Sequence, residues 1–254
     1  MRVLLIEDHT QLAGLVSREL RQEYDYEVTS VRNPIEAAER YQDETYDVVV
    51  VDMLYEQLSR EFDERRTVGR RALTGGRLLV SGLTAVSDVG ARSKRTGVVL
   101  WTSGEANRRL HLLYAYEDLG VRVFCSKSAG TGDTGPLREA MSAAVAGRAH
   151  VDPVLNAYLP VDGAPTVSAT FLRDKAKRSI WRCLALGARS RGEISEISGY
   201  STRTVGNLIS GMLEDVMALD PGVRRTGAPM SEVASYASRN WEFLLDDVVR
   251  ARYP

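Results

Sequence analysis

The chain has 254 residues, a formal net charge of −1 and 44% hydrophobic residues. This length predicts one large or two small domains, and the apolar content excludes a fully disordered chain. The absence of any run of about 18 apolar residues excludes a membrane-spanning helix. The start of the chain lacks the layout of a signal peptide, and Cys125 and Cys183 belong to no metal-spaced cluster. We therefore expect a soluble protein of the reducing cytoplasm.

The charged residues are unevenly distributed. Residues 1–150 carry 20 basic and 22 acidic groups, whereas residues 166–254 carry 13 basic and 10 acidic groups. A mildly acidic first part and a mildly basic second part indicate two modules, the second of which would meet a polyanion. The basic residues are nearly all arginine, so a retained lysine marks a candidate position for a compact ammonium. The four lysines are Lys94, Lys127, Lys175 and Lys177.

Five short, β-branched apolar runs alternate with amphipathic stretches in the first part of the chain. The runs cover residues 3–6, 26–31, 47–51, 98–101 and 121–125. The helical patterns between and after them cover residues 10–22, 34–42, 77–86, 105–119 and 135–146. Near-continuous apolar runs are typical of parallel strands buried on both faces. Five βα units predict an α/β domain with a doubly wound, five-stranded parallel sheet over residues 1–148.

The rest of the chain follows a different pattern. Residues 149–168 contain three prolines and little charge, which predicts a linker. Residues 169–254 predict a small all-α domain, with helices over 173–186, 192–198, 202–218 and 230–250. Residues 55–74 fit neither pattern, because they are densely charged and interrupt the third βα unit. They predict an insertion.

Polar residues follow four of the predicted strands. In chain order they are Glu7 and Asp8, Asp52, Thr102, and Lys127. Because ligands bind at the carboxyl edge of an open α/β sheet, we expect these side chains to meet. Converging carboxylates raise one another's pKa unless a cation neutralises them, and oxygen donors of this kind suit Mg²⁺. A metal, a hydroxyl and an ammonium around Asp52 would stabilise a phosphoryl group transferred to that carboxylate.

Residues 1–148 resemble the receiver domain of bacterial two-component response regulators. The matching stretches are 4–9 (LLIEDH), 47–52 (DVVVVD), 99–103 (VLWTS) and 123–128 (VFCSKS). The resemblance implies that Asp52 accepts a phosphoryl group, whose charge of about −1.5 to −2 biases a two-state surface. The implied Mg²⁺ ligands are Glu7, Asp8 and Asp52. The implied phosphate-sensing and switch residues are Thr102, Lys127 and Phe124.

The insertion departs from the receiver pattern. Receivers normally have a short loop after the aspartate, with a proline and then a glycine. Here Glu56 stands at the proline position, and a glycine follows only at Gly75 or Gly76. The insertion would be a lid over Asp52, a docking element for a partner or a solvated excursion. The sequence leaves these three readings open, and with them whether Asp52 is phosphorylated.

Residues 192–218 have the pattern of a helix-turn-helix, whose second helix enters the major groove of DNA. Ser201 is the expected N-cap of the second helix. Side chains suited to phosphates or base edges lie on one face of this helix and beyond its end. They are Thr202, Arg203, Thr204, Asn207, Ser210, Arg224 and Arg225. The pattern alone leaves a generic helical bundle equally open.

Residues 173–240 resemble the LuxR-type helix-turn-helix of the NarL/FixJ class of response regulators. The matching stretches are 184–187, 192–205, 208–213 and 231–234. The family usually has a lysine or similar residue after the Thr-Val pair and a histidine two residues later, where this chain has Gly206 and Leu208. Gly206 lowers helix stability by about 1 kcal/mol relative to alanine. With so few cations on this helix, we expect a shallow salt dependence of DNA binding. The apolar extension at 241–249 is expected to cover the core rather than to form a dimer.

These interpretations predict a cytoplasmic, homodimeric transcription regulator of a two-component system. It would bind double-stranded DNA, receive a phosphoryl group on Asp52 from a sensor histidine kinase, and have neither an enzymatic active site nor a membrane partner. In one alternative, the receiver responds to a ligand or a partner protein without phosphorylation. In another, the C-terminal helices bind protein or RNA.

Overall fold

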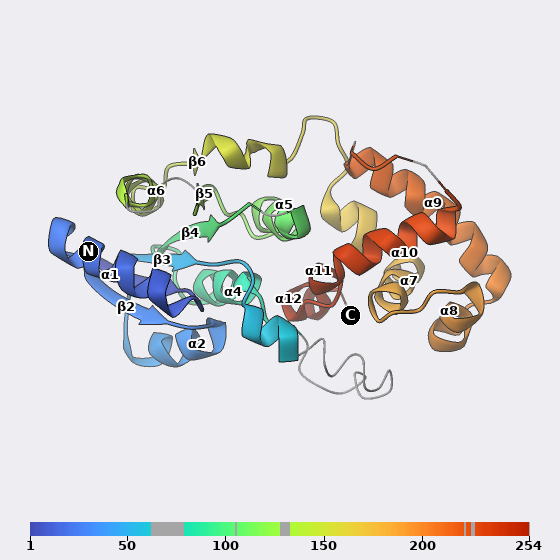
Figure 1. Ribbon diagram of the computed structural model, residues 1–254, viewed down its shortest axis with the longest axis horizontal. Coiled ribbons are helices and arrows are strands. Elements are labelled where there is room, and N and C mark those ends of the chain that lie inside the picture. Colours follow the sequence, from blue (N-terminus) through green and yellow to red (C-terminus); the bar gives the residue numbers. More distant parts are fainter. Residues whose placement is uncertain (62–78, 105, 128–132, 221, 225–226, 254) are drawn as a thin grey trace. The chain divides into compact units, whose positions relative to one another are not determined.

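The computed structural model describes residues 1–253 apart from 62–78, 105, 128–132, 221 and 225–226 (Figure 1). The described residues form two compact units. The N-terminal unit contains those up to residue 159 except Leu79, and the C-terminal unit contains Leu79 and those from residue 160 onwards. No helix within these described ranges combines the length and the hydropathy that a membrane crossing requires.

The N-terminal unit is built on a parallel sheet with the strand order β2-β1-β3-β4-β5-β6. Its strands are β1 (Arg2–Ile6), β2 (Glu27–Val31), β3 (Val48–Val51), β4 (Gly97–Thr102), β5 (Val123–Ser126) and β6 (His150–Val151). The predicted α/β fold class is confirmed, but the prediction of five strands is wrong. The sixth strand has two residues, too few for a recognisable alternation of apolar and polar positions.

Helices cover both faces of this sheet. They are α1 (Thr10–Tyr24), α2 (Pro34–Asp43), α4 (Gly82–Arg92), α5 (Arg109–Glu117) and α6 (Gly135–Val145), with the 3₁₀ turns η2 (Ala106–Arg108) and η3 (Pro153–Tyr158). Alternate strand residues such as Val3, Leu5 and Val50 form one core with α1 and α6. Residues of opposite register, such as Leu4 and Val49, are equally buried. Because β1, β3, β4 and β5 are buried on both faces, their sequences are nearly continuous apolar runs, whereas β2 has exposed and polar positions.

The predicted helix at 77–86 is displaced in the structure. Ser81 accepts a hydrogen bond from the Leu83 N–H at 3.1 Å and caps α4, which begins at Gly82 and continues to Arg92. The Gly82 N–H donates to the Met53 carbonyl at 2.8 Å, so the start of α4 lies against the residue that follows Asp52. The predicted linker is also partly structured, because β6 and η3 lie within residues 149–168.

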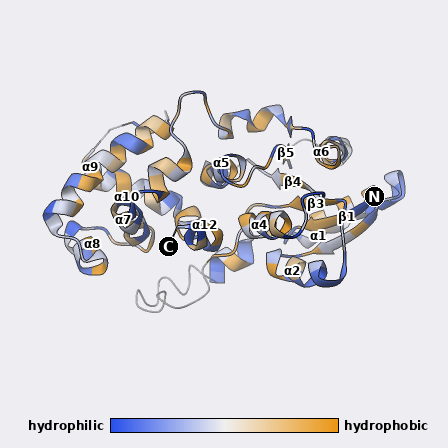
Figure 2. Cartoon of the chain, turned by 180° about the vertical axis from the view of Figure 1, so that it is seen from behind, coloured by the Kyte–Doolittle hydropathy of each residue, from blue (hydrophilic) through white to orange (hydrophobic). Residues whose placement is uncertain are grey.

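The C-terminal unit is helical. Its elements are the π-helical turn η4 (Ser168–Leu172) and the helices α7 (Lys175–Ala185), α8 (Arg191–Ser198), α9 (Thr202–Leu219), α10 (Pro229–Arg239), α11 (Trp241–Leu244) and α12 (Asp247–Arg252). Most helices are banded in both hydropathy colours, as expected for helices with one buried face (Figure 2). The aromatic rings of Phe171, Trp181 and Tyr236 cluster, with centroids 5.1–6.1 Å apart.

The predicted helical stretch at 230–250 is divided into α10, α11 and α12 in the structure. The buried Asn240 amide donates to the Tyr236 carbonyl at 3.0 Å, and Asp246 caps α12 by accepting from the Val248 N–H at 2.9 Å. These side chains satisfy helix ends that periodicity cannot reveal. The Phe243 ring contacts Phe171 with centroids 6.5 Å apart and is fully buried. The extension therefore covers the core of this unit, as expected.

Candidate functional site

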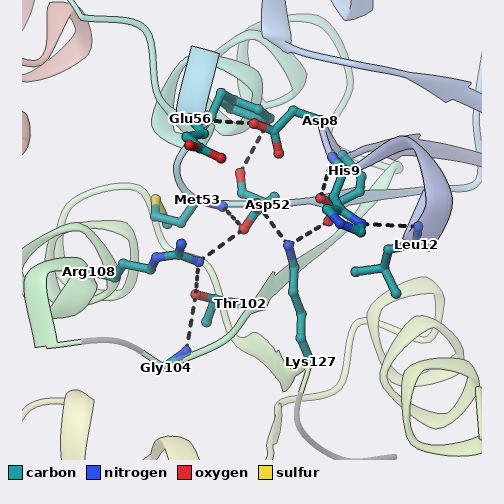
Figure 3. Close-up of polar contacts among 12 residues, drawn as sticks. Asp8, His9, Leu12, Asp52, Met53, Glu56, Thr102, Gly104, Arg108 and Lys127 are labelled. Atoms are coloured by element: carbon teal, nitrogen blue, oxygen red, sulfur yellow. Dashed lines mark hydrogen bonds and ion pairs between the residues drawn. The ribbon is translucent and has the colours of Figure 1, made fainter. Parts of the chain in front are cut away.

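The carboxyl ends of β1, β3, β4 and β5 bring the predicted polar residues together (Figure 3). The Lys127 ammonium lies 2.5 Å from Glu7 Oε2 and 2.8 Å from Asp52 Oδ2. Oxygens of Glu7, Asp8 and Asp52 lie within 4.8 Å of one another. We call Glu7, Asp8, Asp52, Thr102 and Lys127 together the acidic pocket. The neighbouring strand ends of a parallel sheet explain why residues 120 positions apart in sequence meet here.

Burial governs the charges of the acidic pocket. Glu7 and Asp52 are almost fully buried, and loss of solvation raises the pKa of both carboxyls. The positive charge of Lys127 opposes this rise at both groups, and Asp52 raises the pKa of Glu7 further. The two carboxylates therefore need positive charge beside them to stay ionised at neutral pH. Three clustered carboxylates form an oxygen donor set that fits a hard divalent cation such as Mg²⁺.

The acidic pocket has a second cation, Arg108, which the sequence did not predict. Arg108 Nη1 lies 3.5 Å from Asp52 Oδ1 and donates to the Thr102 hydroxyl at 3.4 Å (Figure 3). The Met53 N–H also donates to Asp52 Oδ1, at 2.7 Å. Nothing in the sequence distinguishes Arg108 from the other arginines, because its approach depends on how the loop between β4 and α5 folds. Asp52 thus has Lys127 at one carboxylate oxygen and Arg108 at the other.

The described start of the insertion borders the acidic pocket. The buried Tyr55 hydroxyl donates to the Asp52 carbonyl at 2.8 Å, and the Glu56 N–H donates to Asp8 Oδ2 at 2.7 Å. A proline at position 56 would have no N–H to donate, so the departure from the receiver pattern creates this hydrogen bond. Residues 56–61 are helical. The lid, docking and excursion readings of 55–74 rest mainly on residues outside the described ranges.

Phe124 and Thr102 occupy buried positions on their strands. The Phe124 ring lies on β5, with its centroid 6.2 Å from that of Tyr116. The Lys127 ammonium lies over the Trp101 ring, 5.1 Å from its centroid, within the range of a cation–π contact. The structure places Phe124 on β5. Its role as a switch stays a prediction.

The helix-turn-helix forms a separate candidate nucleic-acid interface. Gly199 ends α8 with φ +77°, and Ser201 caps α9 by accepting from the Thr204 N–H at 3.1 Å. The predicted DNA-contacting side chains of α9 are all exposed: Thr202, Arg203, Thr204, Asn207 and Ser210. The opposite face is buried through Val205, Ile209, Met212, Leu213 and Val216. Arg224 is exposed beyond the helix, and Arg225 lies outside the described residues.

Comparison with known proteins establishes the fold. No protein-family model and no curated protein matches the chain. The structure of RcsB from Salmonella enterica serovar Typhimurium, bound to promoter P1flhDC with the phosphomimetic BeF₃⁻, is 17% identical, with a TM-score of 0.57. That match covers 93% of this chain and 98% of the other. A structure of two RcsB dimers on two parallel DNAs is 15% identical, with a TM-score of 0.55 over 94% of this chain and 98% of that one.

This likeness spans both units. The chain therefore has the fold of a receiver followed by a helix-turn-helix domain, as the sequence analysis predicted.

Proposed function

We propose that this protein is a DNA-binding transcriptional response regulator controlled by phosphorylation of Asp52. The observation that carries the proposal is the acidic pocket, in which a buried carboxylate lies beside an ammonium and two further carboxylates and is linked to a hydroxyl through Arg108. The exposed polar face of α9 and the fold shared with DNA-bound RcsB support the output function. In this proposal the protein acts as a homodimer in the cytoplasm.

The phosphoryl transfer assigns a role to each pocket residue. A carboxylate oxygen of Asp52 attacks phosphorus, the bond to the donor breaks, and an aspartyl phosphate forms. Glu7, Asp8 and Asp52 would hold Mg²⁺, which would supply positive charge to stabilise the transferring group. Lys127 then pairs with the phosphoryl oxygens, and the Thr102 hydroxyl turns toward them. Arg108, which already bridges Asp52 and Thr102, supplies a second cation.

Phosphorylation then shifts the receiver between two conformations of the same surface. The new negative charge draws Thr102 and Lys127 inward, and Phe124 on β5 follows the movement of its strand. Such a shift changes how two copies associate, and a dimer reads a two-fold DNA site. A sensor histidine kinase would supply the phosphoryl group in the cell.

Intact-mass spectrometry tests the phosphorylation directly. The full-length protein is incubated with Mg²⁺ and a small acyl phosphate, in parallel with Asp52→Asn and the control Asp43→Asn, which alters an exposed carboxyl of the same unit. We expect one phosphoryl group on the wild type and on Asp43→Asn, and none on Asp52→Asn. An unmodified wild type would rule out phosphorylation by this route.

A receiver that works without phosphorylation is the second candidate. It is favoured by the partners that the pocket carboxylates already have within the chain: Lys127 for Glu7 and Asp52, Arg108 for Asp52, and the Glu56 N–H for Asp8. A wild type that stays unmodified and still shifts duplex DNA would select this candidate. Indifference to all DNA in a mobility-shift assay on a genomic pool, unchanged by Arg203→Ala, would instead indicate a protein- or RNA-binding module.

A further inference from the structure

Gly206 stands in the middle of α9, where glycine is a poor choice for helix stability. Its backbone φ needs no glycine, since Gly206 is absent from the positive-φ residues of the chain. A Cβ at this position would lie 3.1 Å from Arg191 Nη1, 3.2 Å from Arg191 Cζ and 3.5 Å from Arg191 Nε. The guanidinium of Arg191 therefore occupies the space beside Gly206 that the side chain of any larger residue would fill.

Arg191 makes no polar side-chain contact in the described structure. It is the first residue of α8, where the helix dipole disfavours a positive charge. Its side chain is exposed and forms no hydrogen bond or ion pair with any residue that the structure describes. An unpaired cation at an unfavourable helix end, placed against a glycine, indicates a function outside the chain's own stability.

The position of Gly206 defines the surface that Arg191 joins. Residues 203, 206, 207 and 210 share one face of α9 by their spacing, and Arg203, Asn207 and Ser210 are exposed there. Within α9, whose residues are all described, Arg203 is the one cationic side chain. The guanidinium held over Gly206 supplies this face with a second cation, carried by the preceding helix.

We infer that Arg191 binds a phosphate of the DNA backbone and that Gly206 provides the seat for its guanidinium. This inference rests on the proposed DNA-binding function. The first helix of a helix-turn-helix crosses the DNA backbone while the second enters the groove, so a cation at the start of α8 is placed for phosphate rather than for bases. The planar guanidinium can lie flat on a glycine and still direct N–H groups outward, which an ammonium cannot do.

The test measures binding of the full-length protein to a labelled duplex of random sequence by fluorescence anisotropy at several salt concentrations. We expect Arg191→Ala to weaken binding and to reduce the salt slope by about 0.9, the value for one phosphate contact. The fall in affinity between 50 and 200 mM salt then becomes about 3.5-fold smaller than in the wild type. An unchanged salt slope in Arg191→Ala overturns the inference.

Substitution of the seat gives a second test. Gly206→Ala improves helix propensity, so it should fold, and it should displace the guanidinium and weaken binding as Arg191→Ala does. Gly211→Ala is the matched control, because a Cβ at 211 in the same helix meets no atom within 4 Å apart from its chain neighbours and the backbone of the helix itself. If Gly206→Ala acts through Arg191, it has no further effect in an Arg191→Ala background. If the losses of affinity from Gly206→Ala and Arg191→Ala add in the double variant, Gly206 does not act by holding the Arg191 guanidinium.

Two outcomes separate this inference from the function on which it rests. A wild type that binds no duplex at any salt concentration removes the proposed function itself. A wild type that binds, and loses affinity in Arg203→Ala but not in Arg191→Ala, leaves the function standing and refutes the role of Arg191. A loss in Arg191→Ala that differs between duplex sequences refutes the phosphate assignment, because a phosphate contact weakens binding uniformly.

Discussion

The acidic pocket and the exposed polar face of α9 carry charge in opposite ways. We call this face, which contains Arg203, Asn207 and Ser210, the recognition face. In the pocket, Glu7 and Asp52 are buried and paired with Lys127 and Arg108, so each charge depends on its neighbours. On α9, Arg203 is exposed, and water already solvates its charge. A substitution in the pocket should therefore change both stability and chemistry. A substitution of an exposed polar side chain on the recognition face should change binding alone.

Loss of Lys127 should have the largest effect. Lys127→Met leaves two buried carboxyls without their shared ammonium, and we expect the free energy of unfolding at pH 7 to fall by about 3–5 kcal/mol. Mg²⁺ should restore part of this loss, because it supplies positive charge at the same oxygens. Urea denaturation with and without Mg²⁺ measures both effects. Lys94→Met, at an exposed lysine, is the control, and equal losses in the two variants would contradict the buried ion pair.

Alanine substitutions at the two glycines of α4 distinguish the effect of close packing beside Asp52 from the effect of helix propensity. A Cβ at Gly82 would lie 2.3 Å from the Asp52 carbonyl oxygen, whereas a Cβ at Gly90 meets no atom within 4 Å apart from its chain neighbours and the backbone of α4 itself. We expect Gly82→Ala to destabilise the protein by about 1–3 kcal/mol through overpacking. Gly90→Ala should stabilise it by about 0.5–1 kcal/mol. Thermal unfolding checks both values, and a stable Gly82→Ala protein would show that this close approach is not required.

A buried histidine makes the stability of the N-terminal unit depend on pH. Burial, with a smaller effect of the Arg108 charge, lowers the pKa of His111 to about 3. The folded state then binds fewer protons than the unfolded state between pH 6.5 and 3, so stability falls as pH drops through this window. The expected slope is about 1.4 kcal/mol per pH unit. Urea denaturation at pH 6 and pH 5 measures it.

The matched variants for this test are His111→Gln and His150→Gln. His111→Gln should flatten the slope between pH 6 and pH 5, and His150→Gln should leave it near the wild-type value. Equal slopes in all three proteins would show that His111 is not the group responsible.

The smallest expected change in stability comes from the recognition face. Arg203→Ala should leave the free energy of unfolding within about 0.5 kcal/mol of the wild type, because its side chain is exposed. The same variant should bind duplex DNA more weakly in a mobility-shift assay. Arg239→Ala, an exposed arginine on α10, is the control for charge alone. A destabilised Arg203→Ala protein would remove the distinction between the two regions.

Much of the acidic pocket was predictable from the sequence, because a general rule of parallel α/β sheets sets its position. The carboxyl ends of parallel strands meet at one edge, so the order of apolar runs was enough to bring Glu7, Asp52 and Lys127 together. Arg108 was not predictable, because it reaches Asp52 through the path of a loop. The contact between Arg191 and Gly206 was equally hidden, since only the packing of α8 on α9 brings a helix start against a helix middle.

The sequence by itself determined the fold class, the carboxylate and lysine set of the pocket, and the polar face of α9. These depend on periodicity and on residues next to strand or helix ends, which are local properties of the chain. The tertiary structure alone decided the sixth strand, the division of the last helical stretch and the second cation beside Asp52. The sixth strand and the approach of Arg108 depend on contacts between segments distant in sequence, whose energies have no local signature. The division of the last helical stretch depends on side-chain hydrogen bonds at helix ends, which hydropathy periodicity does not reveal.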